Sequence, residues 1–254
     1  MFELIIDHKW LQQKYLVEGM STSKIAELVG CHRVTMWKKL KSLGLPLRQN
    51  ERRYTLNERI FQQCDSAEKA YWLGFIMADG HVHKGRHFLA FQLAAKDKGH
   101  LRKFNQLISS NAPIGERTIF SFGKECTIAH LTIYSKQLTQ DLAQFGVVPN
   151  KTGIETMSNI PINYARDFIR GYFDGDGWVS RGKRYILGMA SASKVLICDI
   201  ARWIHCQGIS KKLHSVSFKN NCYSINFSGQ TAKRLHACLY QDVTVFLERK
   251  KDAI

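Results

Sequence analysis

Two aspartates, each followed by glycine, end two apolar, helix-like segments of the chain. The segments are AYWLGFIMADGHV (residues 70–82) and RDFIRGYFDGDGWV (residues 166–179), and the aspartates are Asp79 and Asp176. If the two helices pack side by side, the carboxylates meet, and like charges at close range repel unless a cation lies between them. Carboxylate oxygens with open water positions suit Mg²⁺. Such a pair therefore predicts a metal site that can activate a water molecule.

Small residues recur at a spacing of four in both segments, as Gly74 and Ala78 in the first and Gly171 and Gly175 in the second. Residues four apart share one helix face, and small side chains there let two helix backbones approach closely. A glycine inside a helix costs about 1 kcal/mol relative to alanine, so it needs a packing reason. We expect the two helices to supply that reason for each other.

The Asp-Gly pairs have two other interpretations. Asp-Gly often closes a helix or opens a turn without any chemistry. The string DGDG also begins like a calcium-binding loop, but the later ligand positions of such a loop would fall on Trp178 and Tyr185, which rules that interpretation out.

The order of elements after each segment repeats: two strands, a helix, two strands and a helix. Each segment is followed by a predicted hairpin. We expect later strands near residues 118–122, 127–134, 212–218 and 222–227, and helices near 97–109, 135–145, 193–207 and 230–247. The chain from residue 67 is therefore predicted to contain two halves of the same design.

This repeat resembles the LAGLIDADG homing endonucleases over residues 66–254. WLGFIMADG and IRGYFDGDG are similar to the family signature, with Asp79 and Asp176 at its last acidic position. FGVVPNKT (145–152) and VFLERKKD (245–252) resemble the segments that close each half. The resemblance implies an α+β fold with two pseudo-symmetric αββαββα half-domains, 67–153 and 154–254, and saddle-shaped antiparallel sheets. It also implies a metal-dependent, site-specific endonuclease that cuts both strands of double-stranded DNA.

The resemblance assigns the site residues. Asp79 and Asp176, with the backbone carbonyls of Ala78 and Gly175, would hold Mg²⁺, for which Mn²⁺ or Ca²⁺ could substitute. Lys151 and Lys250 close the two halves, and each would lie near its own aspartate and stabilise developing phosphate charge. Arg249 or Lys251 could take the role of Lys250, and a solvated basic cluster is the alternative. Met77 stands where the second segment has Asp174, so the two sites are expected to be unequal.

Residues 1–46 predict a separate helix-turn-helix domain. Residues 21–43 resemble the DNA-binding domains of resolvases and invertases, with Gly30 at the turn. The third helix, from His32 to Leu43, would enter the major groove, where Arg33 could bind a guanine edge and Val34 a thymine methyl group. The predicted contacts are Arg33, Val34, Trp37, Lys38 and Lys41. The alternative is a small helical bundle that packs against the rest of the protein.

Further DNA contacts are predicted from the linker and from the strands. Residues 47–66 are expected to form a linker that follows the DNA backbone with Arg48, Arg52 and Arg53, or else a solvated connector. The sheets would contact DNA through His81, His83, Lys84, Arg86 and Gln92 in the first half and Ser180, Arg181, Lys183, Arg184 and Lys219 in the second. Alternate residues of a strand lie on opposite faces, so an error of one residue inverts this list.

Composition favours the same class of partner. The 254 residues include 37 Lys and Arg against 21 Asp and Glu, a formal net charge of +16, which favours a polyanion because each neutralised phosphate releases counterions. A basic soluble protein without a nucleic-acid role remains the alternative. We expect no membrane span and no signal peptide, and a protein that acts as a monomer.

The seven cysteines are odd in number and form no C-x-x-C pair, which predicts free thiols in a reducing compartment, cytoplasmic or organellar, or in a phage-infected cell. A zinc site from Cys206, His214, Cys222, His236 and Cys238 is the less favoured alternative, because the spacing matches no zinc pattern. Two other functions stay open: a transcription regulator of the same fold without cleavage, although such sporulation regulators lack the acidic pair, and an intron RNA maturase.

Overall fold

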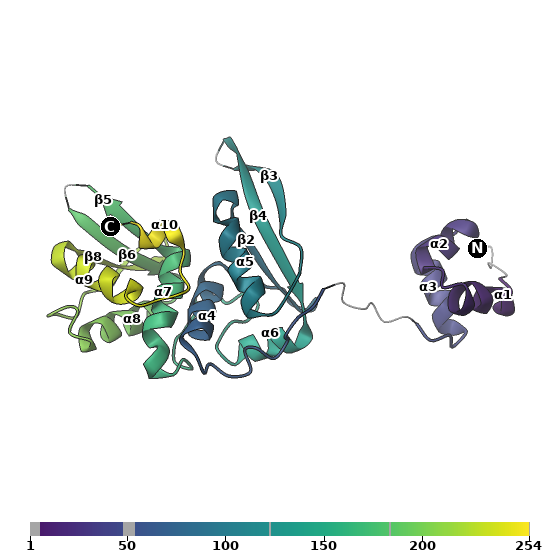
Figure 1. Cartoon of the computed structure of the whole chain (residues 1–254), viewed down its shortest axis with the longest axis horizontal. Coiled ribbons are helices and arrows are strands. Elements are labelled where there is room, and N and C mark those ends of the chain that lie inside the picture. The colour runs from purple at the N-terminus through teal and green to yellow at the C-terminus, as the bar shows by residue number, and fades with distance from the viewer. Residues whose placement is uncertain (1–5, 48–53, 122, 183, 254) are drawn as a thin grey trace. The chain divides into compact units, whose positions relative to one another are not determined.

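The computed structural model describes residues 6–47, 54–121, 123–182 and 184–253. The chain divides into two compact units, Met1–Arg52 and Arg53–Ile254 (Figure 1). Within the described residues, none of the helices combines the length and the apolar character that crossing a membrane requires.

The first unit is all-helical. It contains α1 (His8–Gln12), which continues into the π-type turn η1 (Gln13–Val17), then α2 (Thr22–Leu28) and α3 (Arg33–Ser42). The Ser21 side chain accepts a hydrogen bond from the Lys24 amide at 3.2 Å and so caps α2. Gly30, with φ +66°, permits the turn between α2 and α3. The core of the unit is formed by Leu11, Tyr15, Ile25, Ala26, Met36 and Leu40.

The second unit contains two halves with the same order of elements. The first half has α4 (Ala67–Asp79), β1 (His81–Val82), β2 (Phe88–Ala94), η2 (Ala95–Asp97), α5 (Lys98–Leu107), β3 (Gly115–Ser121), β4 (Lys124–Tyr134) and α6 (Lys136–Ala143). The second half has η3 (Ile162–Tyr164), α7 (Ala165–Asp176), β5 (Gly177–Arg181), β6 (Tyr185–Ser191), α8 (Lys194–Cys206), β7 (Ser217–Lys219), β8 (Cys222–Ser228), α9 (Gly229–Tyr240) and α10 (Glu248–Lys251). The sheets have the orders β1-β2-β4-β3 and β5-β6-β8-β7, and every pairing is antiparallel. The predicted α+β fold with two similar halves is confirmed.

Helices cover one face of each sheet. Helices α5 and α6 pack on the first sheet, and α8 and α9 on the second. In β2, Leu89, Phe91 and Leu93 are buried on the helix-covered face, whereas Gln92 is exposed on the other. This alternation follows from the two-residue period of a strand. Among the described helices, those that pack on the sheets lie on the buried face, and we call the opposite face of each sheet its open face.

Helices α4 and α7 lie side by side at the centre of the second unit, with one sheet on each side (Figure 1). Two glycines make this close packing possible. A Cβ atom at Gly74 would overlap the Phe168 carbonyl oxygen, and one at Gly171 would overlap the Tyr71 carbonyl oxygen. Each helix thus accepts the other's backbone at its own glycine, which is the arrangement that the small-residue spacing predicts.

Some elements differ from the expected ones. The last long helix ends at Tyr240 rather than near residue 247, and Gln241 has extended backbone angles, because the following segment is drawn into contacts with α7 and α5. Strand β7 is limited to Ser217–Lys219. The expected linker is packed from Tyr54 onwards, since Phe61 and Cys64 are buried in the core of the second unit. Residues 48–53 lie outside the described part of the chain.

Candidate metal centre and nucleic-acid interface

The two aspartates occupy the last positions of the paired helices. Asp79 ends α4 and Asp176 ends α7, and Gly80 and Gly177 follow in extended conformation. A Cβ atom built on Gly175 would lie 3.3 Å from Oδ2 of Asp79, so the Asp79 carboxylate lies against the last turn of α7. Asp79 is half-buried and Asp176 is exposed. The close helix packing therefore brings two carboxylates to one edge of the helix pair.

The electrostatics of the pair reflect this proximity. Burial and, to a lesser extent, repulsion from Asp176 raise the pKa of Asp79 to about 6, against the opposing charges of Arg249, Lys250 and Lys151. Partial burial also raises the pKa of Asp176, although its side chain reaches solvent, while the nearby Tyr172 side chain and the charge of Lys151 lower that pKa. A site that raises carboxylate pKa values in this way favours a bound cation.

Each predicted lysine reaches the carbonyl that follows its own aspartate. Lys151 Nζ donates to the Gly80 carbonyl oxygen at 2.6 Å, and Lys250 Nζ donates to the Gly177 carbonyl oxygen. Burial lowers the pKa of Lys250 to about 8 and also lowers the pKa of Lys151. The charges of Lys151 and Lys250 each lower the pKa of both aspartates. Lys151 is the cation that lowers the pKa of Asp176 most.

The structure separates Lys250 from its basic neighbours. Lys250 is 6% exposed, whereas Arg249 Nε donates to Asp97 at 2.9 Å and Lys251 Nζ lies 3.9 Å from the centre of the Phe246 ring. The charge of Arg249 nevertheless lowers the pKa of Asp79 more than the charge of Lys250 does. The C-terminal basic cluster is therefore ordered against the protein, and Lys250 is the member that contacts the residue after Asp176.

The donor set at this edge fits a hard divalent cation. Two carboxylates lie near carbonyls of the last helical turns, including those of Ala78 and Gly175, where helix carbonyls have no intrahelical partner. Among the described residues no group of three or more His, Cys, Asp and Glu side chains is placed to hold a metal. Oxygen ligands that leave positions for water and phosphate are those that Mg²⁺ accepts, so the residues present fit Mg²⁺.

Removing the negative charge of Asp79 is expected to stabilise the metal-free protein at neutral pH. Because the folded pKa of Asp79 is raised, its contribution to stability is present at low pH and is lost as pH rises towards about 6. Asp79→Asn should therefore have a higher melting temperature than the parent protein at about pH 7.5, and the difference should shrink towards about pH 4. Differential scanning fluorimetry in a chelator measures both values.

The matched control is Asp199→Asn, on the exposed side of α8, where the carboxylate pairs with Arg202 at 2.5 Å. This variant should gain no stability. Added Mg²⁺ should raise the melting temperature of the parent protein more than that of Asp79→Asn, by mass action on the folded state. An equal rise in both proteins would contradict a cation site at Asp79.

A second carboxylate of α7, that of Asp174, is fully buried, and no local pattern in the sequence predicts a structural role for it. It accepts hydrogen bonds from the Tyr71 hydroxyl of α4 at 2.6 Å, the Tyr240 hydroxyl and the Leu247 amide at 2.7 Å. Burial raises the pKa of Asp174 to about 6 while these hydrogen bonds lower it. Asp174 thus joins α7 to α4 and to the segment that leads to Lys250. Met77, at the matching position of α4, is buried and supplies no such acceptor.

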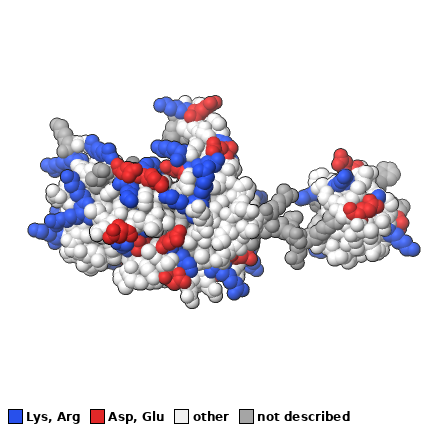
Figure 2. Space-filling model, in the orientation of Figure 1, with Lys and Arg blue, Asp and Glu red and all other residues white. Residues whose placement is uncertain are grey.

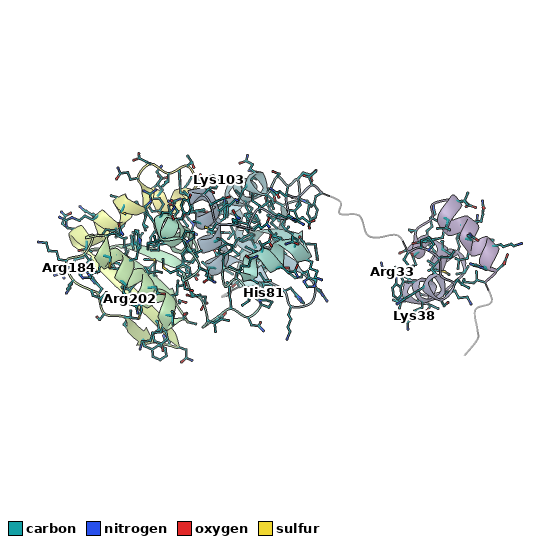
Figure 3. All side chains as sticks on the ribbon, turned by 90° about the horizontal axis from the view of Figure 1, so that it is seen from below. Arg33, Lys38, His81, Lys103, Arg184 and Arg202 are labelled. Carbon is teal, nitrogen blue, oxygen red and sulfur yellow. The ribbon has the colours of Figure 1, made fainter. Side chains whose placement is uncertain are left out.

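The open faces of the two sheets carry part of the predicted DNA-contact set. His81 and Gln92 share the open face of the first sheet, and their partners in the register are Ala90 and His130. In the second sheet, Ser180 and Lys219 lie on the open face with Ser217 and Trp178. His83, Lys84, Arg86 and Arg184 belong to the hairpin loops, with Arg184 at one end of the unit (Figure 3). Lys183 lies outside the described residues.

One predicted contact faces elsewhere. Arg181 shares a strand face with Gly177 and Val179, opposite to Ser180. Its guanidinium donates to the Ala253 carbonyl at 2.8 Å and the Asp252 carbonyl at 2.7 Å. Arg181 therefore contacts the C-terminal segment rather than the open face, because the register of β5 places Ser180 there.

Other residues of the open face escaped the sequence prediction. Arg117 and Lys124 are exposed, and their register with β4 and β3 places them on the same face as Gln92, while the His130 ring covers Gly115. The available signal was the alternation of residues along β3, which contains Arg117, and β4, which contains Lys124. It could not be used, because the two strands begin earlier than the expected residues 118 and 127.

The exposed side of α3 carries the predicted set of the front unit. Met36 and Leu40 are buried, whereas Val34 and Trp37 are 46% and 44% exposed, and Arg33 and Lys38 reach solvent (Figure 3). Lys41 Nζ lies 5.3 Å from the centre of the Trp37 ring. Arg48, Arg52 and Arg53 lie outside the described residues. Over the second unit, Lys and Arg side chains project from both halves in the face that Figure 2 shows.

Three comparisons place this architecture among known proteins. Residues 163–248 match the family described as a LAGLIDADG-like domain. The homing endonuclease I-WcaI bound to its DNA recognition sequence is similar in structure, with a TM-score of 0.55, 12% identity, and coverage of 84% of this chain and 97% of that one. The full-length DUF199/WhiA of Thermatoga maritima gives a TM-score of 0.48 at 16% identity, covering 78% of this chain and 66% of that one.

A curated relative, the replication factor C small subunit of Methanocaldococcus jannaschii, is 26% identical over 189 residues. The match covers 73% of this chain, but the chain spans about a tenth of the length of that relative.

Proposed function

We propose that this chain, which contains a LAGLIDADG-like domain and has the two-half fold of LAGLIDADG homing endonucleases, is a site-specific endonuclease that hydrolyses one phosphodiester in each strand of double-stranded DNA. One observation carries the proposal. Two aspartates end two helices whose backbones meet at Gly74 and Gly171, and a half-buried or buried lysine reaches the residue after each aspartate. This set of groups suits hydrolysis of two phosphodiesters better than DNA binding alone.

Each group has a chemical task in this proposal. Asp79 and Asp176, with the carbonyls of Ala78 and Gly175, would hold Mg²⁺, which when bound supplies activation of water and charge stabilisation at the phosphate. Lys151 and Lys250 place positive charge beside the two carboxylates, where it stabilises negative charge that develops on the phosphate oxygens. Their fixed hydrogen bonds to Gly80 and Gly177 keep these charges in place before the substrate arrives.

The substrate surface follows from the open sheet faces and the charge. Gln92, His130 and Arg117 in the first sheet, and Ser180, Asn226 and Lys219 in the second, offer donors and acceptors that could contact base edges and phosphates. The net charge of +16 favours the phosphate backbone. I-WcaI, of similar fold, is bound to its DNA recognition sequence, which supports a duplex rather than another polyanion.

A cleavage experiment tests the function. A supercoiled plasmid carries the uninterrupted version of the host locus and is incubated with the protein and Mg²⁺. We expect a linear product with Mg²⁺ and none with a chelator. Tight binding of this DNA without any cut would instead favour the regulator, in which the same fold binds DNA and the chemistry is absent.

Removing the front unit is expected to shorten the recognised site and to leave the chemistry in place. A chain that begins after residue 46 keeps the whole core of the second unit, because the two units have separate cores. The loss of Arg33, Lys38 and Lys41 removes phosphate and base contacts. We expect a shorter footprint, weaker binding and a smaller dependence of affinity on salt.

The control is a full-length chain with Arg33, Lys38 and Lys41 replaced by alanine, which should weaken binding in the same direction without removing any helix. These residues are exposed, so the unit should keep its fold. An unchanged footprint and affinity in both proteins would show that α3 does not contact DNA.

A further inference from the structure

The segment that carries Lys250 leaves the second half and docks on the first. After α9 the chain runs through residues 241–253, which we call the C-terminal arm. Lys103 of α5 donates to the Phe246 carbonyl at 3.1 Å and pairs with Glu248 at 2.6 Å, while Arg249 donates to Asp97 at 2.9 Å. Lys103, labelled in Figure 3, and Asp97 both belong to the first half, Lys103 in α5 and Asp97 at the end of η2. The first half therefore contacts the arm on both sides of Leu247.

The second half holds the same arm at alternating points. The Leu247 amide donates to Asp174 at 2.7 Å, and His236 Nε2 lies 2.9 Å from the Lys250 carbonyl oxygen. Contacts with the two halves thus alternate along the arm. The first half holds Arg249, and the second half holds the backbone of Lys250, the next residue. The direction of the Lys250 side chain depends on backbone atoms that both halves hold.

A comparable contact lies close to Lys151 in the sequence. Lys151 closes the first half, and the chain that follows it is held by Ser193, whose hydroxyl donates to the Glu155 carbonyl at 2.7 Å. Ser193 precedes α8 as Asp97 precedes α5, and α5 and α8 are the matching helices of the two halves. The residue before each of these helices therefore contacts a segment that adjoins one of the two lysines.

We propose that the first half positions the active-site lysine of the second, and that Asp97 and Lys103 are the positioning residues for Lys250. The inference rests on the proposed nuclease function. Lys103 and Glu248 are 28% and 60% exposed, and Arg249 and Asp97 are 42% and 9% exposed. Of the four side chains only that of Asp97 is largely buried, and ion pairs open to solvent add little to stability. These contacts therefore have their main effect on where the arm lies rather than on whether the protein folds.

The experiment separates the two strands. Asp97→Asn and Lys103→Met are combined in the full chain, and cleavage of a plasmid with the target site is followed with each strand labelled. Misplacement of a catalytic group by a fraction of an ångström to an ångström reduces rates by one to two orders of magnitude, so we expect one strand to be cut roughly tenfold more slowly. Nicked circles should accumulate, cut in the same strand that Lys250→Met leaves cut.

Two comparisons identify positioning as the cause. The Asp97→Asn, Lys103→Met change should add nothing to Lys250→Met, because coupled groups are non-additive, and it should slow the remaining strand when added to Lys151→Met. The matched control is Lys98→Met on the same helix, which breaks the pair with Glu116 at 2.6 Å and leaves the arm untouched. Lys103→Arg should restore the parent pattern.

A measurement without cleavage decides the inference independently. An amine-reactive acylating reagent modifies Lys250, and mass spectrometry measures the rate of that modification. The rate should be higher in the double variant Asp97→Asn, Lys103→Met than in the control Lys98→Met. If the parent protein cuts no DNA, the proposed function fails, and the labelling rates still test the positioning. If the parent protein cuts DNA but both strands slow equally, or the Lys250 labelling rate is unchanged, the positioning role is overturned and the proposed function stands.

Discussion

The doubly substituted protein Asp79→Asn, Asp176→Asn is expected to bind its target with unchanged affinity or more tightly and to lose double-strand cleavage by about 10³-fold or more. A loss of this size is expected because the two carboxylates would hold the cation that stabilises the charge developing on the phosphate during the reaction. Asparagine keeps the size of each side chain, so the close packing of α4 and α7 at Gly175 is retained. Binding is measured by a mobility shift in Ca²⁺ or a chelator, and cleavage by conversion of supercoiled plasmid.

The single variants make the expectation sharper. If each aspartate serves mainly one strand, Asp79→Asn and Asp176→Asn should nick opposite strands, and the residual rates should differ because Asp174 has no acidic counterpart at Met77. Asp199→Asn, in an exposed pair with Arg202, is the control and should cut like the parent protein. Full double-strand cleavage by the doubly substituted protein would exclude the two aspartates from the chemistry.

A single methyl group at the centre of the helix pair is expected to have the largest effect on stability. In Gly171→Ala the new Cβ would overlap the Tyr71 carbonyl oxygen and lie 2.9 Å from the Phe75 amide nitrogen. Both are backbone atoms, so the helices must separate. We expect a loss on the order of 3 kcal/mol, the upper part of the range for overpacked cores, and a melting temperature lower by about 6–12 °C.

Gly99→Ala is the control, because Gly99 lies in α5 and a Cβ there would meet nothing within 4 Å. This variant should be as stable as the parent protein or up to about 1 kcal/mol more stable, from helix propensity alone. Gly74→Ala should resemble Gly171→Ala, since its Cβ would overlap the Phe168 carbonyl oxygen. Equal melting temperatures for Gly171→Ala and Gly99→Ala would contradict the close approach of α4 and α7.

Local patterns in the chain were sufficient for much of the fold. The spacing of Gly74 and Gly171, the Asp-Gly ends and the alternation in β2 each depend on neighbours in sequence, and these predict the helix pair and the order of elements. The end of the last long helix was less accessible, because the chain leaves that helix at the extended Gln241 and runs to Leu247, whose amide donates to Asp174. That contact joins residues far apart in the chain.

The sequence by itself determined that two carboxylates, Asp79 and Asp176, end two similar helices, since composition and period alone place them there. Only the tertiary structure decided which other groups act with them. Asp174 is a buried acceptor for two tyrosines and an amide, Arg181 contacts the C-terminal arm rather than the open sheet face, and Lys103 of one half holds the arm of the other. The reason is physical: a side chain's partners are set by packing between elements distant in sequence, and no local pattern records that packing.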